Sequence, residues 1–330
     1  MRAEWFVAML AIVIAPPASG KQASYHVVAQ LPAGDGGWDL LSVSAADRRL
    51  YVAHGDRVSA FDLRTGKTID RLVAGQRIHA ALAIPGTHDV LSTNGETNNA
   101  FLFDGRTGRV RATVPTGRNP DAAAYDPATR TVWIMDPGSG DATVVDPAST
   151  KVLATVPVGG SLEFAASDGQ GRLFVNVEDK NEIAVLDTRA RKVVKRFPLE
   201  GCDGPTGIVV DPRANEILSA CGNGVAIVSR PDGTRIASLT IGRGADGAAF
   251  DPVRKVVLVP AGRDGNITVI QLGAKPSVVG QAPTAASART IAVDPSTGRA
   301  YLPAATLAPA QPGERPKAVP GTFRVLVVAP

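Results

Sequence analysis

Residues 119–160 read NPDAAAYDPATRTVWIMDPGSGDATVVDPASTKVLATVPVGG, and this stretch is the unit from which the rest of the chain is built. Four short runs rich in small, β-branched and aromatic residues occupy positions 121–125, 131–135, 142–145 and 152–158. The turn pairs Asp126-Pro127 and Asp146-Pro147, together with Pro137-Gly138, separate these runs. Runs of this length between such turns predict a four-stranded antiparallel meander.

The turn that follows the first run recurs along the chain at intervals of 40 to 44 residues. A regular period of this length indicates one supersecondary unit repeated side by side. The side chains at these turns are mostly Asp or Ser, which accept backbone N–H groups and favour turns, so we give them a structural role. The seven turn marks are Ser44, Ile84, Asp126, Ser167, Asp211, Asp251 and Asp294.

The two ends of the chain predict how the repeats close. A strand-like run at residues 25–30 precedes the first unit and matches an outer, fourth strand. The last unit offers only three runs, at 288–293, 299–303 and 323–328. The N-terminal strand can therefore complete the last blade, which removes an exposed sheet edge. We predict an all-β, seven-bladed β-propeller of four-stranded antiparallel blades, forming a single domain over residues 21–330.

The first twenty residues differ from the repeats. Arg2 precedes an apolar run at residues 5–15, and a small-residue site follows at residues 18–20. This pattern predicts a secretory signal peptide over residues 1–20, with an uncleaved anchor as the alternative because Glu4 weakens the basic start. We therefore expect a periplasmic or secreted protein with no transmembrane segment in the mature chain.

Composition narrows the choice of partners. The formal net charge is +4, and the basic residues are scattered over turns without an aromatic platform or a basic run. Nucleic-acid binding proteins combine those two features, so we expect no nucleic acid as partner. We expect a monomer whose partner is an unidentified small molecule or protein.

Between the turns D-P-x-T-R and D-x-x-T-G lie LYVA (residues 50–53), VWIM (132–135) and LFVN (173–176). These motifs resemble the YVTN-type β-propeller repeat proteins of bacteria, and the resemblance covers residues 25–330. EDKNEIAVLD (178–187), CDGPTG (202–207) and ARTIAVDP (288–295) are similar to an exported branch of that family. The resemblance implies a propeller fold, while the biochemical role it implies is poorly defined.

The turn marks also locate a candidate site. In a propeller, the loops that enter the inner strands and those that join second to third strands open on one face. The first set lies five residues before each mark, at the mouth of the central channel, and the second lies ten residues after it. Polar side chains at or beside the first position are Asp39, His79, Asp121, Glu163, Thr206, Asp246 and Arg289, and those of the second set are His54, Asn94, Asp136 and Glu178.

Two interpretations of this polar rim are open. Channel mouths are solvated and naturally carry polar residues. Alternatively, the rim is a ligand site, because oxygen ligands with one or two imidazoles suit a divalent metal ion. Arg289 would then grip a carboxylate or phosphate of the ligand. The candidate metal ligands are His79, Asp121, Glu163 and Asp246, joined by Asp39.

Two further features belong to the same rim. Cys202 and Cys221 are the only cysteines and lie in one predicted blade, which favours a disulfide over a thiolate ligand or a reactive thiol. A long proline-rich loop at residues 304–321 interrupts the last blade. It either covers the channel mouth, meets a partner or is a loop without function.

The sequence contains no metalloprotease, haem-attachment, nucleophile-elbow, P-loop or dinucleotide motif. We therefore expect a non-catalytic, exported binding or scaffold protein that uses the polar rim. The alternative is a metal-dependent hydrolase, lactonase or lyase whose site lies at the same mouth. A divalent metal ion is the only cofactor that we consider.

Overall fold

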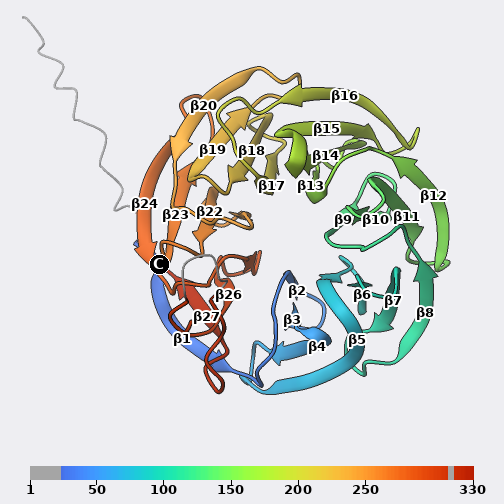
Figure 1. Ribbon diagram of the computed structural model, residues 1–330, viewed down its shortest axis with the longest axis vertical. Coiled ribbons are helices and arrows are strands. Elements are labelled where there is room, and N and C mark those ends of the chain that lie inside the picture. The colour runs from blue at the N-terminus through green and yellow to red at the C-terminus, as the bar shows by residue number, and fades with distance from the viewer. Residues whose placement is uncertain (1–23, 311–315) are drawn as a thin grey trace, which may run out of the picture.

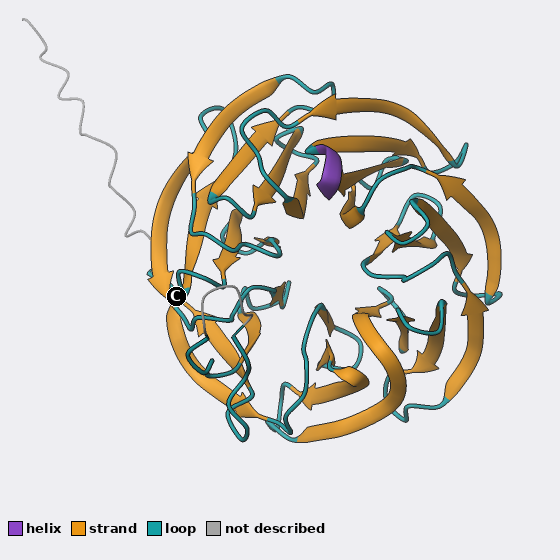
Figure 2. Cartoon of the chain, viewed as in Figure 1, coloured by secondary structure: helices purple, strands orange, loops and turns teal. Residues whose placement is uncertain are grey.

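The computed structural model describes residues 24–310 and 316–330. The predicted signal peptide lies outside the described residues. Within them the chain is built of β-strands, with one three-residue 3-10 helix, η1 (Glu178–Lys180), at the inner edge of the ring in Figure 2. No helix in this part of the chain is long and apolar enough to cross a membrane.

The strands form six hydrogen-bonded antiparallel sheets, which stand side by side in a ring (Figure 1). Five sheets have four strands and one has seven. In sheet order, the strands are β1 (His26–Pro32), β27 (Arg324–Ala329), β26 (Ala300–Ala304) and β25 (Ala292–Val293); β2 (Leu41–Ser44), β3 (Arg49–Ala53), β4 (Gly55–Asp62), β5 (Thr68–Ala83), β6 (Asp89–Asn94), β7 (Asn99–Asp104) and β8 (Val110–Pro115); β12 (Lys151–Pro157), β11 (Asp141–Asp146), β10 (Thr131–Asp136) and β9 (Ala123–Asp126); β13 (Leu162–Ser167), β14 (Arg172–Val177), β15 (Glu182–Asp187) and β16 (Lys192–Pro198); β17 (Pro205–Asp211), β18 (Glu216–Cys221), β19 (Val225–Ser229) and β20 (Arg235–Thr240); β21 (Ala249–Asp251), β22 (Val256–Ala261), β23 (Asn266–Gln271) and β24 (Ser277–Pro283).

Residues 119–160 form the predicted four-stranded meander, β9 to β12. Trp133 pairs with Ala124 on one side and with Val144 on the other, and its side chain is fully buried. The first strand begins two residues later than predicted, although Asp121 still donates its backbone N–H to the carbonyl of Met135 at 2.8 Å. The last strand ends at Pro157, one residue earlier than predicted.

The turn marks hold neighbouring sheets together as well as closing turns. Asp126 is fully buried and accepts hydrogen bonds from the backbone N–H and hydroxyl of Thr129, at 3.0 and 2.6 Å. Its other oxygen accepts a bond from the hydroxyl of Ser167, the mark of the next repeat, at 2.6 Å. Asp251 likewise accepts a bond from Tyr25 at 2.7 Å. Their structural role follows from these contacts.

The seven-stranded sheet is where the structure differs from a simple count of repeats. β5 is sixteen residues long, and its first part pairs with β4 while its second part pairs with β6. Gly75 lies in the middle of β5, where an added Cβ would meet Asn94 Oδ1 at 2.3 Å. This glycine permits close packing rather than a turn, so the strand continues and joins two repeats in one sheet.

The N-terminal strand pairs with the C-terminal one. β1 lies antiparallel to β27, from His26 opposite Ala329 to Pro32 opposite Arg324. The inner strand of this sheet, β25, is only two residues long, and the side chains of Arg289 and Thr290 just before it bond to the first repeat. The first and last segments of the chain therefore share one sheet, as predicted.

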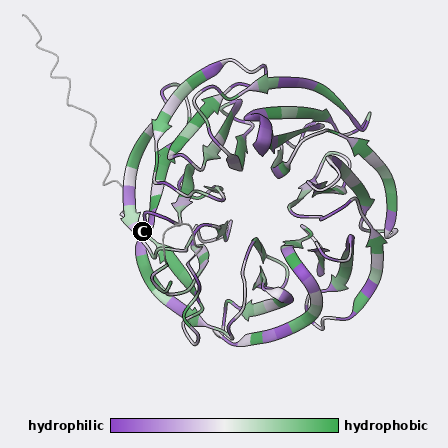
Figure 3. Ribbon diagram, viewed as in Figure 1, coloured by the Kyte–Doolittle hydropathy of each residue, from purple (hydrophilic) through white to green (hydrophobic). Residues whose placement is uncertain are grey.

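The core lies between neighbouring sheets. Middle strands such as β10 and β22 are buried along their whole length, whereas outer strands such as β16 alternate exposed and covered residues. Figure 3 shows this alternation as hydrophilic and hydrophobic segments along the outer strands of the ring. Burial of both faces accounts for the valine- and leucine-rich middle strands.

Candidate functional site

Polar side chains from six of the repeats meet at the end of the ring where the chain enters the inner strands. Asp39, Asp121, Asp246 and Arg289 come just before strands β2, β9, β21 and β25, while His79 and Glu163 lie in β5 and β13. We call this set the mouth ring: Asp39, His79, Asp121, Glu163, Asp246 and Arg289. Thr206, which holds the same place in β17, donates its hydroxyl to the carbonyl of Ala245 at 3.0 Å and so supports the backbone.

The tightest part of the mouth ring joins Asp39, His79 and Asp121. Nδ1 of His79 lies 2.8 Å from Asp39 Oδ2 and 3.9 Å from Asp121 Oδ1. Burial lowers the pKa of His79, but the hydrogen bond with Asp39 and the negative charge of Asp121 together raise it above its usual range. These three residues offer one nitrogen and two oxygen ligand atoms within 4.8 Å of one another.

Arg289 connects the other side of the ring. Its Nε donates to Asp246 Oδ2 at 2.6 Å, and its guanidinium lies 3.8 Å from Asp39 Oδ1. The same side chain donates to the backbone carbonyl of Trp38 at 3.1 Å. Arg289 was predicted to grip an acidic ligand. In the structure these protein groups occupy it, so it links the sixth and first repeats.

Negative charge is in excess around the ring. Burial, followed by the charges of Asp121, Asp246 and Glu178, raises the pKa of Glu163 to about 9. Burial and the charge of Asp39 raise the pKa of Asp121 to about 7, against the opposing effect of His79. Burial also raises the pKa of Asp246 to about 6, although Arg289 opposes it. Each shift has the same meaning: an ionised carboxylate is costly here unless a cation joins it.

The second predicted set behaves differently, because three of its four members, His54, Asn94 and Asp136, are fully buried. His54 is fully buried, its Nδ1 lies 2.9 Å from the hydroxyl of Ser59, and its ring stacks on Phe323 at 4.2 Å. Burial lowers the pKa of His54 to about 4, so it is neutral at pH 7. Asn94 is also fully buried and donates to Asn99 Oδ1 at 2.9 Å.

Asp136 lies at the end of β10, opposite Asp141 of β11. It is fully buried and accepts a hydrogen bond from the hydroxyl of Thr143 at 2.6 Å. Burial raises the pKa of Asp136 to about 7, and Asp141 raises it further against the opposing bonds from Thr143 and Gly117. Burial and the neighbouring carboxyl group of Asp141 therefore both oppose ionisation of Asp136.

A cavity of about 1080 Å³ opens beside the mouth ring. Asp246 and Arg289 of the ring line it, and so does Glu178, the first residue of η1. Backbone of Gly204, Gly222, Gly244 and Gly262 lines another part, where the absence of side chains leaves the space open. Entry loops and second-to-third-strand loops therefore do share one face.

The long loop between β26 and β27 supplies the apolar wall of this cavity. Its described parts, residues 305–310 and 316–323, form an arm in which Ala308 N–H bonds to Lys317 and Val319 N–H bonds to Thr306, each at 2.8 Å. Leu307 and Val319 of the arm line the cavity together with Phe323 and Trp38, whose rings lie 5.5 Å apart. Phe323 opens the run predicted at residues 323–328 and Trp38 directly precedes Asp39, but the repeat pattern gave no sign that their rings meet.

The disulfide stands next to the same cavity. Cys202 and Cys221 are bonded, as predicted, and both are buried. Cys221 pairs with Pro205 at the start of β17, and its neighbour Gly222 lines the cavity. The bond therefore ties the entry loop of the fifth repeat to its second-to-third-strand loop.

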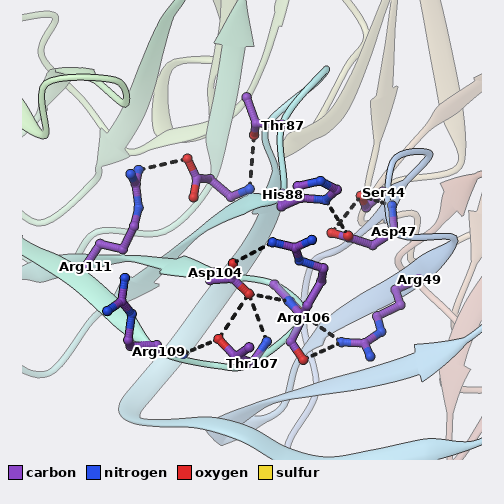
Figure 4. A network of polar contacts seen from close by, with 12 residues as sticks. Ser44, Asp47, Arg49, Thr87, His88, Asp104, Arg106, Thr107, Arg109 and Arg111 are labelled. Carbon is purple, nitrogen blue, oxygen red and sulfur yellow. Dashed lines mark hydrogen bonds and ion pairs between the residues drawn. The ribbon is translucent and has the colours of Figure 1, made fainter.

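A second histidine–aspartate pair lies at the opposite end of the strands. Figure 4 shows His88 pointing toward Asp47, with Nδ1 2.6 Å from Asp47 Oδ1, above a set of turn residues that includes Asp104 and Arg49. Arg49 donates to the carbonyls of Gly105 and Arg106, and Asp104 accepts bonds from Arg106 and Thr107. These contacts close turns and join two repeats, so we assign this network a structural role.

Comparison with solved structures identifies the fold. A chain in the crystal structure of the mitotic checkpoint complex matches 100% of this chain with 99% of its own length, at a TM-score of 0.77 and 12% sequence identity. Hydrazine synthase from Kuenenia stuttgartiensis matches 81% of this chain with 92% of its own, at a TM-score of 0.69 and 15% identity. Both have β-propeller-like folds. No protein-family model and no curated protein sequence matches this chain.

Proposed function

We propose that the protein is an exported, non-catalytic binding protein that takes a small organic cation in the cavity beside the mouth ring. The observation that carries this proposal is the meeting of an acidic ring with an apolar wall at one cavity. The ligand would be an amine or another cationic group attached to an apolar body. The YVTN-type motifs support an exported propeller of this kind.

We count the scaffold as seven blades in a single domain over residues 21–330. The seven-stranded sheet would be two blades that share β5, since β5 is long enough to serve as the outer strand of one and the inner strand of the next. The pairing of β1 with β27 would close the ring. Closure of this kind leaves no unpaired edge between the first and last blades.

The charge balance favours a cation as ligand. The charged side chains that line the cavity are Asp35, Glu178 and Asp246 against Arg263, Arg289 and Lys317. The carboxyl groups of Asp39, Asp121 and Glu163, in the rest of the mouth ring, add negative charge beyond this balance. The raised pKa values of Asp121, Glu163 and Asp246 reflect first the cost of burying each charge and then the repulsion of neighbouring carboxylates. A bound cation reverses that cost, and the water-excluding wall of Trp38 and Phe323 strengthens the attraction.

The hydroxyl groups of the cavity support a binding role rather than nucleophilic catalysis. Ser287 donates to the carbonyl of Ala305 at 2.7 Å, and Thr206 donates to the carbonyl of Ala245. A nucleophilic serine or threonine needs a base within hydrogen-bond reach. Both hydroxyls instead hold backbone segments in place.

Export agrees with the disulfide between Cys202 and Cys221, since such bonds persist in oxidising compartments. We therefore place the protein in the periplasm or outside the cell. The disulfide would keep the glycine-lined part of the cavity in shape there.

A screen of matched ligands tests the proposal. Primary and quaternary amines on aromatic or aliphatic bodies, and carboxylates on the same bodies, would be compared by thermal shift and by tryptophan fluorescence. We expect the amines alone to raise the melting temperature and to change the emission of Trp38, which lines the cavity. Trp38→Phe should remove the fluorescence response, because Trp133 is fully buried far from solvent.

The matched variants are Glu178→Gln in the cavity and Glu200→Gln on an exposed turn. Glu178→Gln should weaken amine binding by about tenfold, the loss expected when one partly buried charge contact is removed. Glu200→Gln should leave it unchanged. Equal responses to amines and carboxylates, or a response that survives Trp38→Phe unaltered, would contradict the proposal.

A further inference from the structure

The mouth ring contains a second place for a ligand, separate from the cavity. Asp39, His79 and Asp121 do not line the cavity, which reaches the ring only at Asp246 and Arg289. They come from the first three repeats, whereas the cavity is bounded mainly by the fifth, sixth and seventh. The inference below therefore does not depend on the cavity ligand.

We propose that Asp39, His79 and Asp121 bind a divalent transition-metal ion. Their ligand atoms lie within 4.8 Å of one another, and the separations from His79 Nδ1 are 2.8 Å to Asp39 and 3.9 Å to Asp121. Metal–ligand bonds of about 2.0–2.2 Å give neighbouring ligand atoms separations of roughly 3 to 4 Å. The three atoms thus surround a point that all of them can reach.

The backbone holds these three side chains at a fixed spacing. Leu40 N–H donates to the carbonyl of His79 at 2.9 Å, which ties the Asp39 loop to β5. The buried hydroxyl of Thr93 accepts a bond from Ala80 N–H at 2.9 Å and donates to the carbonyl of Asp121 at 2.8 Å. It therefore ties β5 to the Asp121 loop. Preorganised ligands of this kind bind metals without a large loss of conformational entropy.

Thr290 completes this support from the last repeat. Its buried hydroxyl donates to the carbonyl of Asp39 at 2.9 Å. The backbone of Asp39 is then held at both its carbonyl and its N–H, because the N–H donates to the carbonyl of Ala53 at 3.0 Å. This fixes the point from which the carboxylate extends. Three repeats, the first, second and seventh, thus converge on the position of one carboxylate.

The second nitrogen of His79 is a separate indication of a ligand. Nε2 is buried and has no hydrogen-bond partner among the described residues, and the same holds for Asn119 Oδ1. Both atoms lie 3.0 Å from the position that a Cβ would take at Gly95. A metal on Nδ1 requires the proton to sit on Nε2, which would make Nε2 a donor near the same glycine as the unpartnered acceptor Asn119 Oδ1. Metal-bound histidines commonly donate this second N–H to an outer partner.

The ligand set indicates the class of metal. One imidazole with two carboxylates, and open positions toward the channel, suits Mn²⁺, Fe²⁺, Co²⁺ or Zn²⁺. Calcium is disfavoured because it takes six to eight oxygen ligands. Arg289 contacts Asp39 only at 3.8 Å and is engaged by Asp246 at 2.6 Å. The nearest partner of both carboxylates is therefore His79 itself, at 2.8 and 3.9 Å.

The test uses metal ions alone on the mature protein after chelator treatment and dialysis. Isothermal titration with Zn²⁺, and electron paramagnetic resonance with Mn²⁺, should each give one site per chain. His79→Gln and Asp121→Asn should each lower the affinity at least tenfold. Asp121→Asn also removes a costly buried charge, so it is expected to fold even if the histidine variant is unstable.

The control is His88→Gln, which removes the other histidine with an aspartate partner, at 2.6 Å from Asp47. It should bind metal like the unmodified protein. Gly95→Ala should weaken binding, because its Cβ would lie 2.9 Å from the ring of His79. The inference is overturned if no stoichiometric site is found, or if Asp121→Asn binds as tightly as His88→Gln. Glu178→Gln should leave metal binding intact, which separates this result from the fate of the cavity proposal.

Discussion

Replacing Glu163 by glutamine should make the protein more stable at neutral pH. The pKa of this carboxyl is raised to about 9 in the folded chain, from 4.5. Between these two values the folded state keeps a proton that the unfolded state has released. Stability therefore falls as pH rises through this window, by about 1.4 kcal/mol per pH unit. Glutamine cannot ionise and removes this dependence.

The size of the effect follows from the same two values. At pH 7, which is 2.5 units above the ordinary pKa of 4.5, Glu163 lowers the stability of the unmodified protein by about 3 kcal/mol. At pH 5 it lowers stability by less than about 1 kcal/mol. Chemical unfolding of Glu163→Gln and of the unmodified protein at pH 5, 7 and 8.5 measures the difference. Glu200→Gln, on an exposed turn, serves as control and should show no such trend.

A gain in stability that grows with pH would support the account of the mouth ring as an unneutralised acidic centre. The reasoning is refuted if Glu163→Gln is less stable than the unmodified protein at pH 7, or if the difference is the same at pH 5 and pH 8.5. Either result would mean that the carboxylate of Glu163 is ionised and well compensated in the folded chain.

Three further outcomes are expected. Replacing both Cys202 and Cys221 by serine should lower stability by about 3 kcal/mol under oxidising conditions, since the disulfide closes a loop with a sequence separation of 19. A loss below about 1 kcal/mol in chemical unfolding would contradict this stabilising role of the disulfide. Asp141→Asn should stabilise the protein at pH 8 but not at pH 5, because it removes a negative charge that, together with burial, opposes ionisation of Asp136. Thermal unfolding of the variant and of the unmodified protein at both pH values tests this difference. Asp126→Ala should cost about 2–4 kcal/mol, because it leaves Thr129 and Ser167 without their acceptor; a neutral result in urea unfolding would show that the turn mark is dispensable.

The strands and their order were predictable from the sequence because the signals are local. Apart from β5, each strand has at most eight residues, and turn residues such as Asp126 and Asp146 mark the ends. The odd N-terminal strand followed from counting, since the last repeat lacked one. The joining of the first two repeats through β5 was not predictable, because Gly75 suggests a break in sequence but serves close packing against Asn94 in space.

Part of the candidate site was likewise predictable from the sequence, and part was not. Counting from the turn marks selected Asp39, His79 and Asp121, which the contacts bring together. Their binding of a ligand stays a prediction. The count could not tell that His54 packs beneath Phe323, because the direction of a side chain at the end of a strand depends on the neighbouring sheet.

The apolar wall of the cavity could not be predicted from the sequence, for a different reason. Trp38 and Phe323 are 285 positions apart in sequence and meet only because the first and last repeats are neighbours in the ring. The repeat pattern does not show that two such residues meet. The long loop was recognised as exceptional, but its contribution to the cavity depends on the pairing of Ala308 with Lys317.

The most direct test of the central claim compares one charged ligand with its neutral counterpart. The tightest amine from the ligand screen and its N-acetylated form would be titrated into the unmodified protein and into Glu178→Gln by calorimetry. We predict that the unmodified protein prefers the amine at least tenfold and that Glu178→Gln loses most of this preference. Equal affinity of the unmodified protein for the amine and its acetylated form would contradict the claim that the cavity beside the mouth ring selects a cation.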